Sequence, residues 1–179
     1  MNDIYNLERF IKAQEHSYQK ALKEVKNGKK CSHWMWFIFP QIDGLGSSAI
    51  SKEYSIKNSQ EAKDYLNHKI LGKRLIEITN PLMQLKDKSV RSIFGYPDDL
   101  KLKSSMTLFR TVSPNNEIFS NVLAKYFNNE CCEHTEKYCS VCSQHSLLKY
   151  FVKTFENILL SCDIFLKSVI DDFNFKSSG

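Results

Sequence analysis

A histidine and a glycine-containing loop flank the most apolar stretch of this 179-residue sequence. His33 precedes the apolar run of residues 34–39, and a loop with two glycines, Gly44 and Gly46, follows Pro40. Glycines let backbone N–H groups approach an anion, and histidine can exchange protons near neutral pH. The pattern therefore predicts a site for a small anion, phosphate-like or nucleotide-like. If the protein is an enzyme, we expect His33 to be its general acid or base.

A purely structural interpretation of the same residues stays open. His33 and the neighbouring tryptophans would then be core residues, and the glycines would only turn the chain. The loop does not follow the glycine pattern of a dinucleotide-binding turn, a P-loop or a nucleophile elbow. The sequence therefore identifies no reaction and does not decide whether the protein is an enzyme.

Several other polar or aromatic residues stand among apolar ones and could converge on this loop. Buried polar groups need partners, so they would form either a shared ligand pocket or an internal hydrogen-bond network. Lys101 and the loop amides would stabilise negative charge. Ser104 and Ser105 lie within one turn of Lys101, in the reverse of the Ser-x-x-Lys order, which favours capping or packing over a lysine-activated serine. The predicted ligand-binding residues are Trp36, Gln41, Gly44, Gly46, Ser48, Tyr54, Lys101, Ser104 and Ser105.

A cysteine-rich segment between residues 130 and 146 forms a second candidate site. Zinc takes four tetrahedral nitrogen and sulfur ligands, and the spacing allows Cys132, His134, Cys139 and Cys142 to supply them. Inert thiols or redox chemistry remain alternatives. With no export signal at the N-terminus, we expect thiols or metal ligands rather than disulfides among the six cysteines.

Composition indicates a soluble globular protein. Hydrophobic residues make up 42% and charged residues 25%, which is typical of a chain with a packed core. The formal charge of +5 is spread out, and its densest patch, at Lys20, Lys23, Lys26, Lys29 and Lys30, is best explained by a solvated helix face. We expect no nucleic-acid partner. The longest apolar run has only six residues where a membrane span needs about 20, so we expect an intracellular, cytoplasmic protein without membrane contact.

Three-four spacing of apolar residues predicts an all-α fold. One helix is expected from residue 4 to 27 with Gly28 at its C-terminal cap, then a buried segment at residues 31–40 that periodicity assigns to neither helix nor strand. Asn58 or Ser59 should cap the next helix, and Pro81 should close or kink the one after it. Asp98 or Asp99 should cap a helix reaching residue 109, and another should end near residue 127.

The strongest periodic signal belongs to the C-terminal residues 147–179, where a long amphipathic helix is expected. We therefore predict a helical domain at residues 4–146 followed by a helical extension at 147–179. The apolar face of that helix would pack on the domain itself, or would bind a second copy or a partner protein. A noncatalytic interaction module acting through this helix is the alternative to ligand binding.

The string His-Trp-Met-Trp-Phe-Ile-Phe-Pro-Gln at residues 33–41, with Ser48 and Ser51 behind it and Ser-Ser-Met-Thr-Leu-Phe at 104–109, resembles the uncharacterised family called domain of unknown function 1810. The resemblance covers residues 4–127. It implies a compact, all-helical single domain and brings no established activity, cofactor or catalytic residue. After Asn128 the chain departs from the family pattern, because the cysteine-rich segment stands where an acidic, threonine-containing helix start is usual.

Overall fold

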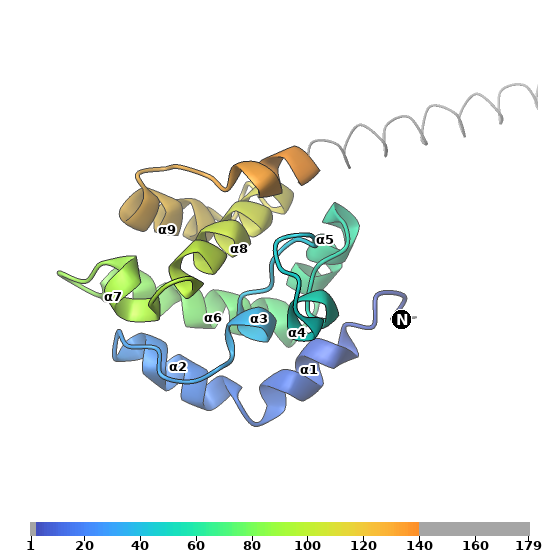
Figure 1. The fold of residues 1–179 in the computed structure, drawn as a ribbon, viewed down its shortest axis with the longest axis horizontal. Coiled ribbons are helices and arrows are strands. Elements are labelled where there is room, and N and C mark those ends of the chain that lie inside the picture. Colours follow the sequence, from blue (N-terminus) through green and yellow to red (C-terminus); the bar gives the residue numbers. More distant parts are fainter. Residues whose placement is uncertain (1–2, 140–179) are drawn as a thin grey trace, which may run out of the picture. The chain divides into compact units, whose positions relative to one another are not determined.

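The computed structural model describes residues 3–139, and these residues form helices joined by short loops (Figure 1). The predicted extension and long helix at 147–179 lie outside the described residues, as do Cys142 and the domain boundary at 146. The described part contains no strand, and its β-type pairing is a single parallel bridge between Ile42 and Ile56. The all-α prediction is confirmed for residues 3–139. In chain order the helices are α1 (Glu8–Glu15), α2 (Tyr18–Lys26), α3 (Met35–Ile38), α4 (Ala49–Glu53), α5 (Ser59–Asn67), α6 (Leu71–Gln84), α7 (Val90–Phe94), α8 (Asp98–Val112), α9 (Glu117–Phe127) and a final segment at residues 133–139.

The expected helix of residues 4–27 is two helices, α1 and α2, which meet at an angle (Figure 1). The break lies at Ser17, whose hydroxyl donates to the carbonyl of Ala13 at 2.7 Å and whose backbone N–H bonds to Gln14 O at 3.1 Å. Such local bonds compete with the helical ladder. At the far end, Gly28 has a φ of 65° and ends α2 with the predicted left-handed cap.

Helix α8 is the central element, because it packs against α5, α7 and α9. Its residues from Ser104 to Phe109 are all buried, so even its polar side chains face other parts of the protein. Phe109 stacks between Tyr65 and Phe119, with ring centroids 5.5 and 5.6 Å away. One side of α8 is thus packed into an aromatic cluster through Phe109, and this packing fixes the position of the polar residues on the same helix.

Helices α5 and α6 approach so closely that only glycine fits at position 72. A Cβ there would lie 1.8 Å from the carbonyl oxygen of Leu66. The side chain of Asn58 caps α5 as predicted, by accepting a hydrogen bond from the backbone N–H of Glu61 at 2.9 Å. Helix α6 continues past Pro81 to Gln84, so Pro81 does not end it.

Two sequence predictions are settled differently or in more detail by the structure. The buried segment at 31–40 contains the short helix α3. Pro97, not Asp98 or Asp99, is the N-cap residue of α8, and both aspartates lie in its first turn, where they form ion pairs. Because the helix begins at Asp98, both carboxylates lie one or two residues past the N-cap position.

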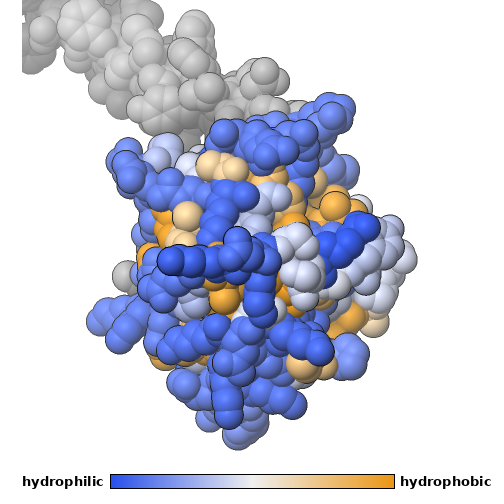
Figure 2. All heavy atoms as spheres, turned by 90° about the vertical axis from the view of Figure 1, so that its left-hand side faces the viewer, coloured by the Kyte–Doolittle hydropathy of each residue, from blue (hydrophilic) through white to orange (hydrophobic). Residues whose placement is uncertain are grey.

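The surface of the described part is mainly polar. On the face drawn in Figure 2, hydrophilic side chains predominate, and hydrophobic ones show in small areas between them. Of the five lysines in the predicted basic patch, Lys20, Lys23, Lys26 and Lys29 are exposed, as expected of a solvated helix face. Lys30 is different, because it is paired with Asp98 at 2.7 Å. No helix within residues 3–139 is long and apolar enough to cross a membrane.

Candidate functional site

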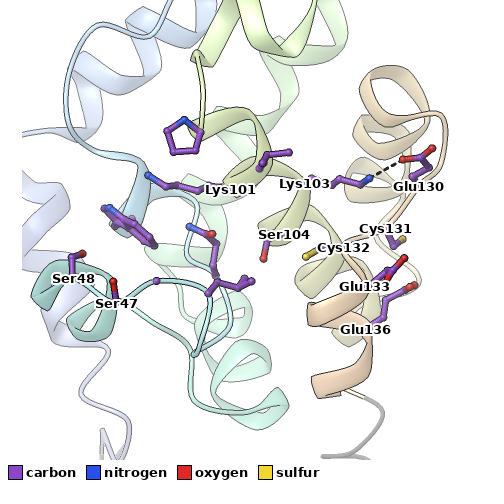
Figure 3. Close-up of a pocket in the computed structure, with 16 residues that line it drawn as sticks. Ser47, Ser48, Lys101, Lys103, Ser104, Glu130, Cys131, Cys132, Glu133 and Glu136 are labelled. Carbon is purple, nitrogen blue, oxygen red and sulfur yellow. Dashed lines mark hydrogen bonds and ion pairs between the residues drawn. The ribbon is translucent and has the colours of Figure 1, made fainter.

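A pocket of about 910 Å³ crosses the exposed side of α8. Figure 3 shows Ser47 and Ser48 on one side of it, Lys101 and Lys103 on α8, and Glu133 on the opposite side. Its volume falls within the range of small-molecule sites, roughly 300–1,000 Å³. We call it the Trp36 pocket; it is lined by Trp36, Gln41, Leu45, Gly46, Ser47, Ser48, Pro97, Leu100, Lys101, Lys103, Ser104, Glu130, Cys131, Cys132, Glu133 and Glu136.

The wall beside Trp36 carries a positive charge. The ammonium group of Lys101 lies 4.3 Å from the centre of the Trp36 ring, within the range of a cation–π contact. Asp98 bridges Lys101 at 2.6 Å and Lys30 at 2.7 Å. Burial alone would raise the pKa of Asp98, but the two ammonium groups outweigh it and lower that pKa. Two cations sharing one carboxylate leave one positive charge in this cluster.

Gln41 also lines the pocket and has only 4% of its surface exposed. Its backbone carbonyl is held by the N–H of Ile56 at 2.8 Å, which fixes the start of the loop. Its side-chain nitrogen Nε2, however, is buried and has no hydrogen-bond partner among the described residues. Native proteins leave few buried polar atoms unpaired, so each one needs an explanation.

The loop after Gln41 packs tightly against Trp36, and glycine makes this possible. A Cβ at Gly46 would lie 2.7 Å from Cβ of Ser51 and 3.0 Å from Cη2 of Trp36. Ser48 lines the pocket but also caps α4, because its hydroxyl accepts from the backbone N–H of Ser51 at 3.2 Å. The Ser48 hydroxyl is therefore already used in part for a hydrogen bond within the protein.

The opposite wall is acidic, and most of its carboxylates form ion pairs. Glu130 accepts from Lys103 at 2.9 Å and Glu136 from Arg110 at 3.2 Å. Lys103 lowers the pKa of Glu130. Lys101 and Lys103 point in opposite directions from α8, the first toward the loop and the second toward Glu130 (Figure 3). The two lysines therefore belong to different walls of the pocket.

This wall is fastened to α8 by neutral hydrogen bonds. The hydroxyl groups of Ser104 and Thr135 lie 2.9 Å apart, and the backbone N–H of Cys132 donates to Thr107 Oγ1 at 3.0 Å. Burial raises the pKa of the Cys131 thiol, so that thiol stays protonated at neutral pH. A reactive thiolate at Cys131 is not supported.

The structure brings most of the predicted ligand-binding residues together, although they are far apart in the sequence. Six of the nine line one pocket: Trp36, Gln41, Gly46, Ser48, Lys101 and Ser104. The other three do not line it. Gly44 lies in the same loop, beside His134; Tyr54 packs its ring against Phe10 and Phe37; and Ser105 is fully buried in the core. Their binding role has no support from this geometry.

His33 does not line the pocket either. It is exposed and lies in a bend whose neighbouring residues are hydrogen-bonded to Glu24. The Glu24 carboxylate accepts from the N–H of Cys31 at 2.8 Å, the N–H of Ser32 at 3.1 Å and Trp34 Nε1 at 2.8 Å, and also from the hydroxyl of Ser32. Burial opposes these bonds, but together they lower the pKa of Glu24 to about 2. We therefore assign His33 no catalytic role at the Trp36 pocket.

The predicted zinc ligands lie in three different settings. Cys132 lines the pocket, His134 is exposed beside Gly44, and Cys139 is 1% exposed in the core. Within residues 3–139, no group of three or more histidine, cysteine, aspartate or glutamate side chains is arranged to hold a metal ion. The fourth predicted ligand, Cys142, lies outside the described residues.

Sequence reasoning missed the acidic wall and the Asp98 bridge. The signals for the wall were weak: Glu133 and Glu136 stand three residues apart, which places them on one helix face. Nothing in the sequence links Lys30 to Lys101, because the bridge through Asp98 joins the segment after α2 to the start of α8. Leu45 and Ser47 belong to the predicted glycine loop, and the other lining residues that the sequence did not indicate are Pro97, Leu100, Lys103 and Cys131.

The fold and the pocket define a small all-helical domain, and comparison with known proteins supports that class. The crystal structure of the conserved hypothetical protein Rv1873 from Mycobacterium tuberculosis has 43% sequence identity and a TM-score of 0.76, and covers 77% of this chain and 99% of its own. The model of the family described as "Protein of unknown function (DUF1810)" matches residues 4–139, so the chain belongs to this family. No curated protein matches.

The family match reaches residue 139, past the predicted end at residue 127. The acidic wall of the pocket therefore lies within the matched region, and the expected departure from the family after Asn128 does not take residues 130–139 out of it.

Proposed function

We propose that the Trp36 pocket binds a small anionic ligand. The observation that carries this proposal is the side-chain amide of Gln41, whose buried Nε2 has no hydrogen-bond partner among the described residues. An unpaired buried donor costs roughly 1–3 kcal/mol. An acceptor oxygen of a ligand would remove this cost, and an anionic oxygen would do so most effectively, since charge-assisted hydrogen bonds are about twice as strong as neutral ones.

The charge distribution supports an anion at the same wall. Lys101 belongs to a cluster with one uncompensated positive charge, because Asp98 is shared with Lys30. Lys103, only two residues away, forms a pair with Glu130 that has no net charge. An anion is therefore expected to bind at the Lys101 wall and not at the Lys103 wall.

Fluorescence titration with inorganic pyrophosphate tests the proposal. The protein has two tryptophans, of which Trp34 is 1% exposed and Trp36 lines the pocket, so Trp36 should report binding. Changing Lys101→Met keeps the aliphatic stem and removes the charge, and should weaken binding by about tenfold or more. Lys103→Met is the matched control, and should change the affinity by less than about threefold, because its charge is already compensated.

In the Trp36→Phe variant the fluorescence change should disappear while calorimetry still detects the bound anion. Two results contradict the proposal. In the first, pyrophosphate produces no binding signal by either method. In the second, the two lysine variants lose affinity equally, which means that only the general positive charge of the surface attracts the anion.

A further inference from the structure

The two ends of the Trp36 pocket differ in charge, and this difference restricts the ligand. One end has the Lys30, Asp98 and Lys101 cluster with one positive charge. At the other end Glu130 and Glu136 are compensated by Lys103 and Arg110. Glu133 lines the pocket too, but it forms no ion pair or hydrogen bond with any other residue of the described part. A simple anion satisfies only the first end.

A free carboxylate in a pocket selects groups that donate hydrogen bonds. Ionised glutamate is an acceptor only, with two oxygens that can take bonds from neighbouring hydroxyl groups. A vicinal diol presents two such donors at once, as the ribose of a nucleotide does to a carboxylate in dinucleotide-binding folds. An ammonium group would satisfy Glu133 as well, but it would leave the apolar part of the pocket unused.

That apolar part lies at the rim. Leu45 is 36% exposed and Leu100 is 51% exposed, although both are large hydrophobic residues, and both line the pocket together with Pro97 and Trp36. Exposed apolar side chains that gather at a pocket indicate a ligand with an apolar or aromatic surface. A volume of about 910 Å³ is much larger than a phosphate ion needs.

From these three features we infer that the ligand is a nucleoside 5′-phosphate, with its phosphate at Lys101 and Gln41, its ribose hydroxyls at Glu133 and its base against the apolar rim. This inference rests on the proposed anion binding and adds a specificity-determining residue, Glu133. The Lys101 wall alone explains affinity for any small anion. Glu133 explains a preference for a ligand with a ribose.

Calorimetric titration of the full chain with four probes tests the inference. Adenosine 5′-monophosphate should bind about a hundredfold more tightly than inorganic phosphate, with about tenfold from the ribose diol and about tenfold from the base. Its 2′,3′-dideoxy analogue should lose about tenfold, roughly the effect of one hydrogen bond to a charged group. Ribose 5-phosphate should bind with intermediate affinity, because it keeps the phosphate and the diol and lacks the base. Equal affinity for ribose 5-phosphate and the nucleotide would overturn the assignment of the base to the rim.

A variant at Glu133 separates the ribose from the phosphate. Glu133→Ala should bind the nucleotide and its dideoxy analogue equally, while its affinity for inorganic phosphate stays unchanged or rises. Because Glu133 is exposed and unpaired within the described part, the variant should keep the melting temperature of the wild type. Glu15→Ala, which removes the same charge from an exposed residue that does not line the pocket, should keep the preference for the diol.

The outcomes distinguish this inference from the proposal on which it rests. If inorganic phosphate and the nucleotide bind equally at the Lys101 wall, the pocket is an anion site and the nucleoside phosphate is the wrong ligand class. If Glu133→Ala keeps the discrimination against the dideoxy analogue, Glu133 does not bind the ribose. If none of the four probes binds, both the inference and the proposed function fail.

Discussion

The two tryptophans of this chain are two residues apart and lie in opposite environments. Trp34 is 1% exposed, and its indole nitrogen donates to Glu24 at 2.8 Å. Trp36 is partly exposed and lines the pocket. Each ring has a lysine over it, Lys30 at 5.1 Å from Trp34 and Lys101 at 4.3 Å from Trp36.

What separates the two regions is whether their polar groups have partners. Around Glu24, several donors converge on one carboxylate, so the polar groups satisfy one another inside the protein. Around Gln41, a buried donor has no partner within the described residues, and the neighbouring lysine cluster has excess charge. The first arrangement stabilises the fold, and the second is the kind that a ligand completes.

Asp98 joins the two regions. It bonds to Lys30, which lies over the buried tryptophan, and to Lys101, which lies over the pocket tryptophan. The positive wall of the pocket is therefore linked to the hydrogen-bonded region around Glu24. This link holds the Lys101 ammonium group in place before any ligand binds. Preorganised charge of this kind favours binding because less side-chain entropy is lost on association.

The largest effect is expected from a substitution that disrupts the hydrogen-bonded region around Glu24. Glu24→Ala removes the acceptor for the backbone N–H groups of Cys31 and Ser32 and for the indole nitrogen of Trp34. Leaving several donors unpaired at a buried position should cost about 3 kcal/mol of unfolding free energy. Urea denaturation measures it. Glu15→Ala, at an exposed residue of α1, is the control and should stay within about 0.5 kcal/mol of wild type.

If Glu24→Ala were no less stable than the Glu15 control, the hydrogen bonds around Glu24 would contribute nothing, and the distinction between the two regions would lose its basis.

A smaller effect sharpens the same distinction through pH. The pKa of Glu24 is lowered from 4.5 to about 2 in the folded protein, so the folded state favours the ionised carboxylate. Its contribution to stability is complete above pH 4.5 and is lost as the pH falls toward about 2, where the folded protein also takes up the proton. Subtracting the unfolding free energy of Glu24→Gln from that of wild type isolates this carboxylate from the others.

That difference should be constant between pH 7 and 5 and should shrink steadily below pH 4.5. A difference that stays the same down to pH 2.5 would contradict the assignment of the pKa shift to the ionised carboxylate and its donors.

The fold was largely predictable because it follows from local patterns. Three-four spacing of apolar residues predicted helices in most of the right places, and Gly28 and Asn58 were identified as caps from their residue types. The break between α1 and α2 was missed because it depends on hydroxyl bonds of Ser17 that helical periodicity does not register. The aspartates of α8 were misassigned because Asp98 pairs with Lys30 and Asp99 with Arg91, and both of these partners lie outside α8.

The candidate site was predictable only in part, for a related reason. The glycine loop indicated Gln41, and polar residues standing among apolar ones indicated Lys101 and Ser104; the structure places all three around one pocket. Gln14, another buried glutamine, is structural by contrast, because its side chain is hydrogen-bonded inside the protein. Sequence position cannot tell a polar residue with internal partners from one without, since this depends on contacts between distant segments.

The smallest expected effect compares these two buried glutamines. Gln14 is 1% exposed, and its Nε2 donates to Phe37 O at 2.7 Å and to the hydroxyl of Tyr65 at 3.1 Å; Gln41 is 4% exposed, with Nε2 unpaired among the described residues. Gln14→Leu should therefore lose about 2 kcal/mol of unfolding free energy. Gln41→Leu should change it by less than about 1 kcal/mol, and in the stabilising direction, because a buried donor without a partner is replaced by an apolar group of similar size.

The same Gln41→Leu protein should bind pyrophosphate about tenfold more weakly in the fluorescence titration. Equal destabilisation by the two substitutions would show that Gln41 is satisfied inside the fold, and the pocket would then lose the unpaired donor on which its assignment as a binding site depends.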